Sequence, residues 1–356
     1  MKILLINYDM TVYGGTERVV VNLANSLAKE NHNVAILSVY KKTSLLPFSL
    51  HKNVSLFFLY QNTEILFKSK KITAIKNLIN NIIANKIISR WGGGVDVVLS
   101  NDYQSIIPKL KLKNTRYIKI IHGNFDTYKG CNNLSYFNDI VILTDKELKQ
   151  WKMRHQNIHI IPNFLPYIPS QKTECKQKNI LSVGRFTPGD IKGFLRLIEI
   201  WKIIQNDLKY KEWSLTLVGE GEGKEAIQAK IQNNNLENSI HIKPFTQEID
   251  KEYLNASIYL MCSHCEGFPM VLLEALSFGL PLIAFDIKTG PSDIIENEKN
   301  GYLIPNNDII SFAKKTQALM DNENLRIQMG EKSKQKAIDE FSEKVVISKW
   351  NQVLNL

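Results

Sequence analysis

Two glutamates flank a tight turn in the last third of the chain, at Glu266 and Glu274. The residues that follow Glu266 read Gly267-Phe268-Pro269-Met270 and then Val-Leu-Leu, so a turn leads into a mostly apolar segment. Proline is favoured at the first position of a helix because it has no N–H group to leave unpaired there. We therefore expect a buried helix that starts at Pro269, with its first N–H groups placed to bind anionic oxygens.

The spacing of the two carboxylates limits the chemistry that they can share. If both stood on one helix, eight residues would separate them by about 12 Å, at roughly 1.5 Å per residue. A hydrolytic pair requires carboxyl groups about 5 to 9.5 Å apart. The spacing therefore favours two separate acceptors of hydroxyl hydrogen bonds, and a nucleotide sugar has hydroxyls at both ends with phosphates between them. The alternative is a capped core helix with two incidental acids, in which a buried Glu274 still needs a polar partner.

Two cations stand seven residues apart in the segment from Gly184-Arg185 to Lys192-Gly193. This segment follows an expected strand at 179–183, at the edge where open α/β sheets bind ligands. The fork of Arg185 and the point charge of Lys192 together suit a diphosphate. The alternative is a solvated surface loop. The later turn 219–223 carries two acids and is expected to be structural.

The first half has a glycine turn and a histidine at comparable places. Gly14 and Gly15 lie where the first strand leads into the first helix, and glycines there let a ligand approach the backbone. The turn lacks the G-x-G-x-x-G pattern, which argues against a dehydrogenase. His122 ends an expected strand, where it can hold a sugar hydroxyl or orient a reacting group. A structural histidine is the alternative.

The four cysteines predict neither a disulfide framework nor a metal centre. Cys262 and Cys265 flank His264, but a zinc site needs a second pair of ligands, and no other Cys or His has that spacing. A chain of this size without a disulfide framework is typical of a reducing cytoplasm.

Short apolar runs alternate with helical stretches in both halves, a rhythm typical of parallel sheets. A length of 356 residues suits two domains, and the polar stretch 170–178 is the expected linker. Two such halves imply a cleft between them, where ligands usually bind. The expected strands are 3–6, 34–39, 95–100, 117–122, 139–143 and 158–163, then 179–183, 214–218, 240–242, 258–262 and 281–285. The expected helices are 19–27, 192–206, 223–235, 270–278, 308–320, 323–340 and 342–356.

The formal charge of +10 is concentrated in the first half. Residues 1–170 have 22 Lys and Arg against 10 Asp and Glu, and the remaining residues have 23 against 25. Nucleic acid is an unsupported partner, because no arginine-rich segment, zinc finger or aromatic RNA-binding signature occurs. An anionic membrane surface or a phosphate-bearing lipid fits better. The segment 68–91 has the pattern of a basic amphipathic helix, which can lie on a membrane or bury its isoleucines in the domain.

The chain resembles the family 4 retaining glycosyltransferases of GT-B fold over essentially its whole length. The Phe268-Pro269-Met270 turn and the segment 289–293 are similar to those of bacterial surface-polysaccharide transferases. The resemblance implies an α/β protein of two Rossmann-like parallel-sheet domains that face each other across a cleft. Residues 1–170 would bind the acceptor, with helix 342–356 packed back on them, and residues 171–341 would bind the nucleotide sugar. The matching segments are Gly14-Gly15-Thr16-Glu17, His122, Ile161-Pro162-Asn163, Gly184-Arg185 to Lys192-Gly193, Glu266-x7-Glu274, 289–295 and 300–304.

The resemblance also implies a role for each site residue. Arg185 and Lys192 would neutralise the departing diphosphate, as a metal does in other transferases, and the chain has no Asp-x-Asp metal motif. Glu266 would contact hydroxyls of the transferred sugar and Glu274 the ribose. The implied catalytic residues are His122, Arg185, Lys192 and Glu266; the implied substrate-binding residues are Gly14, Gly15, Gly267, Phe268, Pro269, Met270 and Glu274.

These expectations describe a metal-independent, cofactor-free hexosyltransferase. It would move a hexose or N-acetylhexosamine from a nucleotide sugar, expected to be UDP-linked, to a lipid-linked, lipopolysaccharide or capsule glycan. We expect it in the cytoplasm, peripheral on the cytoplasmic face of the inner membrane. One alternative is a GT-B-fold epimerase of sugar nucleotides. Another is a non-catalytic partner subunit that binds glycan or lipid, against which the intact Arg185, Lys192, Glu266 and Glu274 argue.

Overall fold

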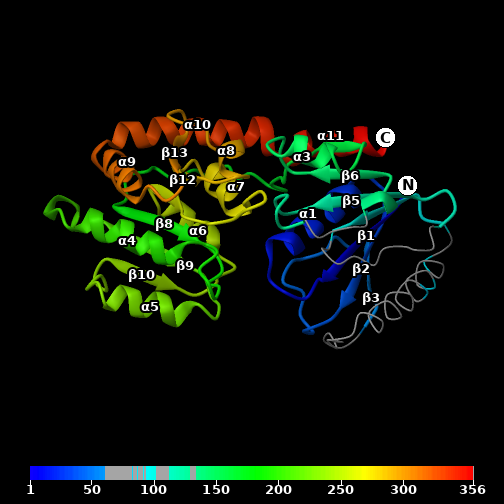
Figure 1. Cartoon of the computed structure of the whole chain (residues 1–356), viewed down its shortest axis with the longest axis horizontal. Helices are drawn as coiled ribbons and strands as arrows, with labels where there is room; N and C mark the ends of the chain where they lie inside the picture. The colour runs from blue at the N-terminus through cyan, green and yellow to red at the C-terminus, as the bar shows by residue number, and fades with distance from the viewer. Residues whose placement is uncertain are drawn as a thin grey trace. The chain divides into compact units, whose positions relative to one another are not determined.

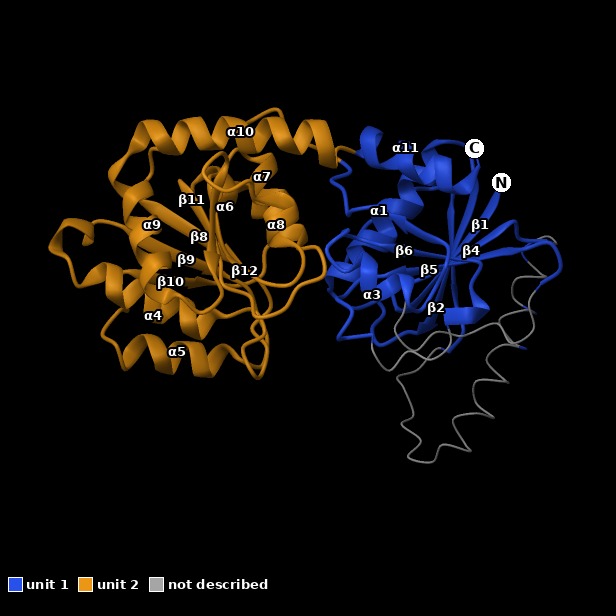
Figure 2. Cartoon of the chain, turned by 45° about the horizontal axis from the view of Figure 1, so that its top comes forward, with its two compact units in different colours: residues 1–166, 343–356 blue, residues 167–342 orange. Residues whose placement is uncertain are grey.

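Two parallel β-sheets form the centres of two units of the chain (Figures 1 and 2). The computed structural model describes residues 1–60, 82, 86, 91, 94–101, 112–128 and 134–355. Unit 1 comprises Met1–Pro166 and Glu343–Leu356, and unit 2 comprises Tyr167–Ser342. Both sheets are parallel and carry helices, so the predicted α/β fold of two Rossmann-like domains is confirmed.

The sheet of unit 1 has the strand order β3-β2-β1-β4-β5-β6-β7. The chain builds outward from β1 in one direction and then continues from its other side with β4. Ligands bind at such a reversal, outside the carboxyl ends of the two strands. The strands are β1 (Lys2–Asp9), β2 (Asn33–Tyr40), β3 (Val54–Phe58), β4 (Val97–Ser100), β5 (Arg116–Ile121), β6 (Asp139–Ile142) and β7 (Ile158–Ile160). The described helices are α1 (Gly15–Lys29), η1 (Leu134–Tyr136), α3 (Leu148–Lys152) and α11 (Glu343–Leu354).

The sheet of unit 2 has the order β10-β9-β8-β11-β12-β13, with its reversal between β8 and β11. Both strands end just before predicted site segments, at Val183 and Met261. The strands are β8 (Asn179–Val183), β9 (Ser214–Val218), β10 (Ile240–Lys243), β11 (Ile258–Met261), β12 (Leu282–Asp286) and β13 (Gly301–Pro305). The helices are α4 (Phe194–Gln205), η2 (Leu208–Tyr210), α5 (Lys224–Gln232), α6 (Ile249–Leu254), α7 (Met270–Ser277), α8 (Pro291–Ile294), α9 (Ile309–Asp321) and α10 (Glu323–Phe341).

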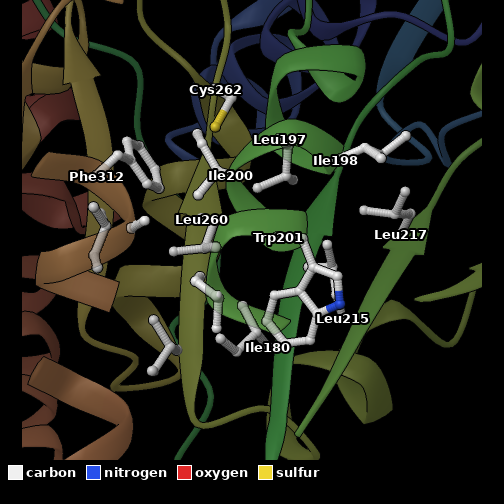
Figure 3. Packing of buried hydrophobic residues seen from close by; sticks show 14 of the residues in the cluster. Ile180, Leu197, Ile198, Ile200, Trp201, Leu215, Leu217, Leu260, Cys262 and Phe312 are labelled. Atoms are coloured by element: carbon white, nitrogen blue, oxygen red, sulfur yellow. The ribbon is translucent and has the colours of Figure 1, made fainter. Parts of the chain in front are cut away.

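The core of unit 2 forms where α4 packs on its sheet. Trp201 and Leu197 of α4 are completely buried with Leu215 of β9 and Leu260 of β11 (Figure 3). Apolar residues recur along α4 at helical spacing, so one face of the helix covers the strands. The start of the same helix therefore lies in a fixed place beside the ends of β8 and β11.

The C-terminal helix α11 belongs to unit 1. Its Val346 and Trp350 are buried in one cluster with Val20 of α1. Its first residue, Glu343, accepts a hydrogen bond from the Ser26 hydroxyl at 2.6 Å. The last residues of the chain therefore complete the core that the first residues begin.

The expected linker 170–178 is wrong. These residues belong to unit 2, which begins at Tyr167, and Thr173 and Cys175 are buried in it. The Thr173 N–H donates to the Phe278 carbonyl and its hydroxyl donates to the Ala256 carbonyl. The polar composition reflects the exposed residues of this segment, while alternate side chains point inward.

Candidate functional site

A lysine and a glutamate from adjacent strand ends form an ion pair in unit 2. The Lys192 ammonium lies 2.7 Å from a carboxylate oxygen of Glu266. Lys192 follows β8 and Glu266 follows β11, so the pair stands at the point where the strand order reverses. The Glu266 side chain is 9% exposed and that of Lys192 is 31% exposed, so a ligand can reach the ammonium.

The turn that carries Lys192 is fixed by its neighbours. Asp190 accepts hydrogen bonds from the Phe194 and Leu195 N–H groups, at 2.8 and 3.0 Å, and so caps the start of α4. Gly193 has φ 71°, and a Cβ there would lie 1.7 Å from the Cys262 carbonyl oxygen. Only glycine lets the turn lie directly on the chain that follows β11.

A buried arginine, Arg196, holds the loop that follows β11. It donates to the carbonyls of Cys262 and Ser263, and to the side-chain oxygens of Asn306 and Asn307. Its guanidinium also lies 4.1 Å from the centre of the Phe285 ring. Sequence reasoning missed this residue, although a charged residue in the apolar run of α4 requires such partners.

Arg185 is exposed on the loop that leaves β8. The glycine turn 219–223 packs beneath this loop, because a Cβ at Gly219 would lie 1.9 Å from the Gly184 carbonyl oxygen. A Cβ at Gly221 would similarly lie 2.2 Å from the Phe186 carbonyl oxygen. This turn is structural, as predicted, and it supports the backbone that presents Arg185.

The turn after Glu266 differs from the expectation by one residue. Pro269 is the N-cap of α7, with extended dihedrals, and its carbonyl accepts from the Leu272 N–H. Glu266 therefore precedes the helix, and the separation calculated for two glutamates on one helix does not apply. The Thr289 hydroxyl donates to the Glu266 carbonyl at 2.5 Å and holds the turn from the other side.

The turn offers a ligand mainly its backbone. Phe268, Pro269 and Met270 are buried, and the Phe268 ring packs against Phe341 with ring centres 5.8 Å apart. Gly267 is only partly buried. The predicted contribution of these residues to substrate binding is therefore through peptide groups rather than side chains.

Glu274 has the polar partner that its burial requires. Its side chain, in α7, is nearly inaccessible, and one carboxylate oxygen lies 2.7 Å from the Tyr253 hydroxyl. The expectation that a glutamate inside this apolar run is paired is confirmed.

In unit 1, Gly14 and Gly15 form the start of α1. The Glu17 carboxylate folds back over Gly14, where a Cβ would lie 2.0 Å from its oxygen. Asn7 at the end of β1 donates to the same carboxylate at 3.1 Å. Apart from its chain neighbours and its own helix backbone, no described atom lies within 4 Å of the place of a Cβ on Gly15, so a ligand could approach the backbone there.

His122 directly follows β5 and contacts Asn101, which directly follows β4. The His122 Nε2 lies 2.9 Å from the Asn101 side-chain oxygen, and the Asn101 amide donates to the Leu99 carbonyl. Because the asparagine oxygen only accepts, Nε2 carries the proton and Nδ1 is the acceptor. Burial and the charge of Lys119 lower the pKa of His122 to about 3, so the ring is neutral at neutral pH.

The predicted site residues thus fall into two groups, each at the carboxyl edge of its own sheet. Among the residues that the structure describes, no three His, Cys, Asp or Glu side chains gather as metal ligands do. Cys262 is buried and Cys265 is exposed. The predicted basic helix 68–91 lies outside the described residues, except for Ile82, Lys86 and Trp91. No helix in the described part of the chain is long and apolar enough to cross a membrane.

Comparison with known proteins agrees with this geometry. Residues 167–336 match the family model of the glycosyl transferases group 1. An uncharacterized glycosyltransferase of Haemophilus influenzae is 29% identical, over 96% of both chains. The amylovoran biosynthesis glycosyltransferase AmsD of Erwinia amylovora is 28% identical over 99% of both. The crystal structure of a mutant of S. aureus TarM, in complex with fondaparinux, alpha-GlcNAc-glycerol and UDP, has a TM-score of 0.82 at 17% identity and covers 100% of both chains.

Proposed function

We propose that the chain is a retaining, metal-independent glycosyltransferase of family 4, built on the GT-B fold of the solved structures that it resembles. In this proposal it moves a hexose or N-acetylhexosamine from a UDP sugar to a lipid-linked, lipopolysaccharide or capsule glycan. The observation that carries the proposal is the 2.7 Å contact between Lys192 and Glu266. It supports the proposal because a cation suited to a diphosphate stands beside a carboxylate suited to sugar hydroxyls, within the matched segment 167–336.

The proposed reaction transfers the sugar between two oxygens. The bond from the anomeric carbon to the diphosphate breaks, and a bond to an acceptor hydroxyl oxygen forms on the same face of the sugar. The proton of that hydroxyl passes to the departing diphosphate. Negative charge develops on the leaving group, where Arg185 and Lys192 would stabilise it without reorganisation. Glu266 would hold the sugar while Glu274 holds the ribose.

The proposed substrates take their support from similar proteins. The TarM structure holds UDP and alpha-GlcNAc-glycerol. The Erwinia amylovora relative acts in the biosynthesis of amylovoran. These properties belong to those proteins, and they favour a UDP donor and a bacterial polysaccharide acceptor for this chain.

We also propose that the first half contacts the anionic cytoplasmic surface of the membrane. Its excess of Lys and Arg favours this partner, since each basic residue near such a surface contributes about 1 kcal/mol. Binding to vesicles rich in anionic lipid should fall as salt rises. Tight vesicle binding that does not change with ionic strength, or absence of binding at low salt, would contradict the proposal.

A transfer assay tests the enzymatic proposal. UDP-glucose, UDP-galactose and their N-acetyl forms are first screened for protection against thermal unfolding, since a ligand of the folded state raises its stability. The stabilising donor is then incubated with lipid-linked glycan extracted from bacterial membranes, with and without EDTA. We expect acceptor-dependent UDP release, an α-linked product from the α-linked donor, and no effect of EDTA. Conversion of the donor to an epimer without acceptor would instead identify an epimerase. Glycan binding without turnover would identify a partner subunit.

A further inference from the structure

We infer that Tyr253 is a positioning residue for ribose recognition, because it orients the carboxylate of Glu274. The inference rests on the proposed function, in which Glu274 binds the ribose of the donor. It adds a residue of α6, outside the segments that carry the sequence motifs.

The contact between the two side chains is a hydrogen bond to a charged group. The Tyr253 hydroxyl lies 2.7 Å from Oε2 of Glu274. An ionised carboxylate can only accept, so the phenol donates. Such charge-assisted bonds are short and about twice as strong as those between neutral groups. One oxygen of Glu274 is therefore held in a defined direction.

The Tyr253 ring is held as firmly as the carboxylate that it contacts. It is completely buried and stacks on Phe278, with ring centres 5.2 Å apart and planes at 10°. It also packs against Tyr259 of β11, with ring centres 6.0 Å apart. Phe278 directly follows α7, the helix that carries Glu274. The hydroxyl can therefore move only if the core between α6, α7 and β11 moves with it.

This rigidity matters for a ligand with two adjacent hydroxyls. A carboxylate that accepts from both the 2′ and the 3′ hydroxyl of a ribose must have its plane set beforehand, since small misplacements weaken such contacts strongly. A site built to bond a hydroxyl rejects the analogue that lacks it, because a buried polar group then loses its partner. Tyr253 should accordingly control the preference for ribose over 2′-deoxyribose.

A purely structural role for Tyr253 predicts a different result. If the phenol only stabilises the buried Glu274, its removal lowers the stability of the fold. It then weakens the binding of ribonucleotides and of deoxyribonucleotides by the same factor. The ratio of the two affinities separates the two roles, because it cancels any general loosening of the site.

The chain offers a matched control in Tyr210. Its hydroxyl also bonds a carboxylate, Asp321, at 3.0 Å, and its side chain is also buried. Tyr210 lies in η2, among none of the predicted site segments. Tyr210→Phe therefore removes the same kind of bond from the same unit.

The experiment measures binding of UDP and 2′-deoxy-UDP to the full chain by titration calorimetry. The wild type should prefer UDP. Tyr253→Phe should raise the Kd of UDP about tenfold and the Kd of 2′-deoxy-UDP less than about threefold. A change of this size is expected when a hydrogen bond to a charged group is lost. Glu274→Gln should abolish the preference, and Tyr210→Phe should leave both affinities unchanged.

Three results would overturn the inference in distinguishable ways. An unchanged preference in Tyr253→Phe removes the positioning role alone. A preserved preference in Glu274→Gln removes the ribose assignment of Glu274 and the inference with it. If the wild type binds none of UDP, GDP or ADP, the proposed function itself fails. Should Tyr253→Phe not fold, Glu274→Asp draws the carboxylate away from the phenol, and it should lower the preference in the same way.

Discussion

The carboxyl edges of the two sheets differ in the charges that they carry. In unit 2, this edge has the Lys192–Glu266 ion pair, the exposed Arg185 and the buried Arg196. In unit 1, the candidate ligand-binding groups at the same edge are a neutral His122 and the open backbone at Gly15.

A charged network of unit 1 lies at the other end of its sheet. Arg116 donates to Asp139 at 2.7 Å, where β5 and β6 begin, and His159 of β7 lies 3.0 Å from the same carboxylate. Arg116 also donates to the Val353 carbonyl of α11. One fold therefore uses charge in two ways: unit 2 has an ion pair at the edge where we propose that the diphosphate binds, and unit 1 uses charge to attach a helix. At the carboxyl edge of unit 1, the neutral His122 and the Glu17 carboxylate beside Gly14 suit an acceptor hydroxyl better than a phosphate.

The largest effect should follow removal of a cation from the edge of unit 2. Arg185→Ala should lower kcat by about 10²- to 10³-fold, because it removes a preorganised donor to the leaving group. Its unfolding midpoint should not change, since Arg185 is exposed. Steady-state transfer assays measure kcat, and thermal unfolding measures the midpoint. Lys202→Ala, at an exposed position of α4, is the control. A loss of less than threefold would contradict a charged leaving-group site at this edge.

A pair of glycine substitutions tests how tightly the edge of unit 2 is built. Gly193→Ala forces a methyl group against the Cys262 carbonyl and should cost about 3 kcal/mol of unfolding free energy. Gly189→Ala, also at positive φ but in open space, should cost only about 1 kcal/mol. Urea unfolding of both variants gives the comparison. Equal costs would mean that backbone conformation alone, and not close packing, requires glycine at 193.

The pH dependence of stability tests the network at the opposite end of unit 1. Burial alone would raise the pKa of Asp139, but hydrogen bonds and charge from Arg116 and His159 hold it below its usual value. A lowered carboxyl pKa stabilises the fold above the unfolded value of about 4, and this stabilisation is lost as the pH falls further. Asp139→Asn should cost about 2 kcal/mol at pH 7, and the difference from wild type should shrink below about pH 4.

Unfolding midpoints between pH 2.5 and 7 measure this effect. Asp145→Asn, at an exposed carboxylate, is the control. A difference from wild type that stays constant across this range would contradict the linkage.

The smallest effect on stability should come from Gly15→Ala, and the prediction for this variant concerns KM. Gly15→Ala meets open space and should change the unfolding free energy by less than about 0.5 kcal/mol. If substrate approaches the backbone there, the added methyl group should raise KM several-fold. An unchanged KM would remove Gly15 from the site, and the comparison of the two edges would then depend on His122.

The sequence predicts strands best where apolar runs are long and buried. It missed β3 and β13, the strands at one edge of each sheet. Every residue of β3 is only half-buried, and β13 starts with Gly301, whose hydrogen atom faces the Leu282 backbone where a Cβ would clash. Edge strands need no continuous apolar run, so their composition is less distinctive.

The candidate site shows the same division between local and distant information. Arg185, Lys192 and Glu266 stand in recognisable segments that follow strands, so their shared edge could be expected. Glu274 lies further on, inside α7. The pairing of Lys192 with Glu266, by contrast, joins residues 74 positions apart. The partners of Arg196 and Tyr253 also come from other elements. Which atoms meet depends on three-dimensional packing, which residue types and spacing do not specify.

The place of α11 in unit 1 has a consequence for how the protein is made. A chain emerging from the ribosome presents residues 1–166 first, but Val346 and Trp350 of their core come last. The intervening unit 2 is continuous and can fold meanwhile. At 5 to 20 residues per second, residues 167–356 take roughly 10 to 40 s to synthesise. During that interval the apolar face of α1 that α11 later covers stays exposed. Unit 1 is therefore the first unit to be synthesised in part and the last to complete its fold.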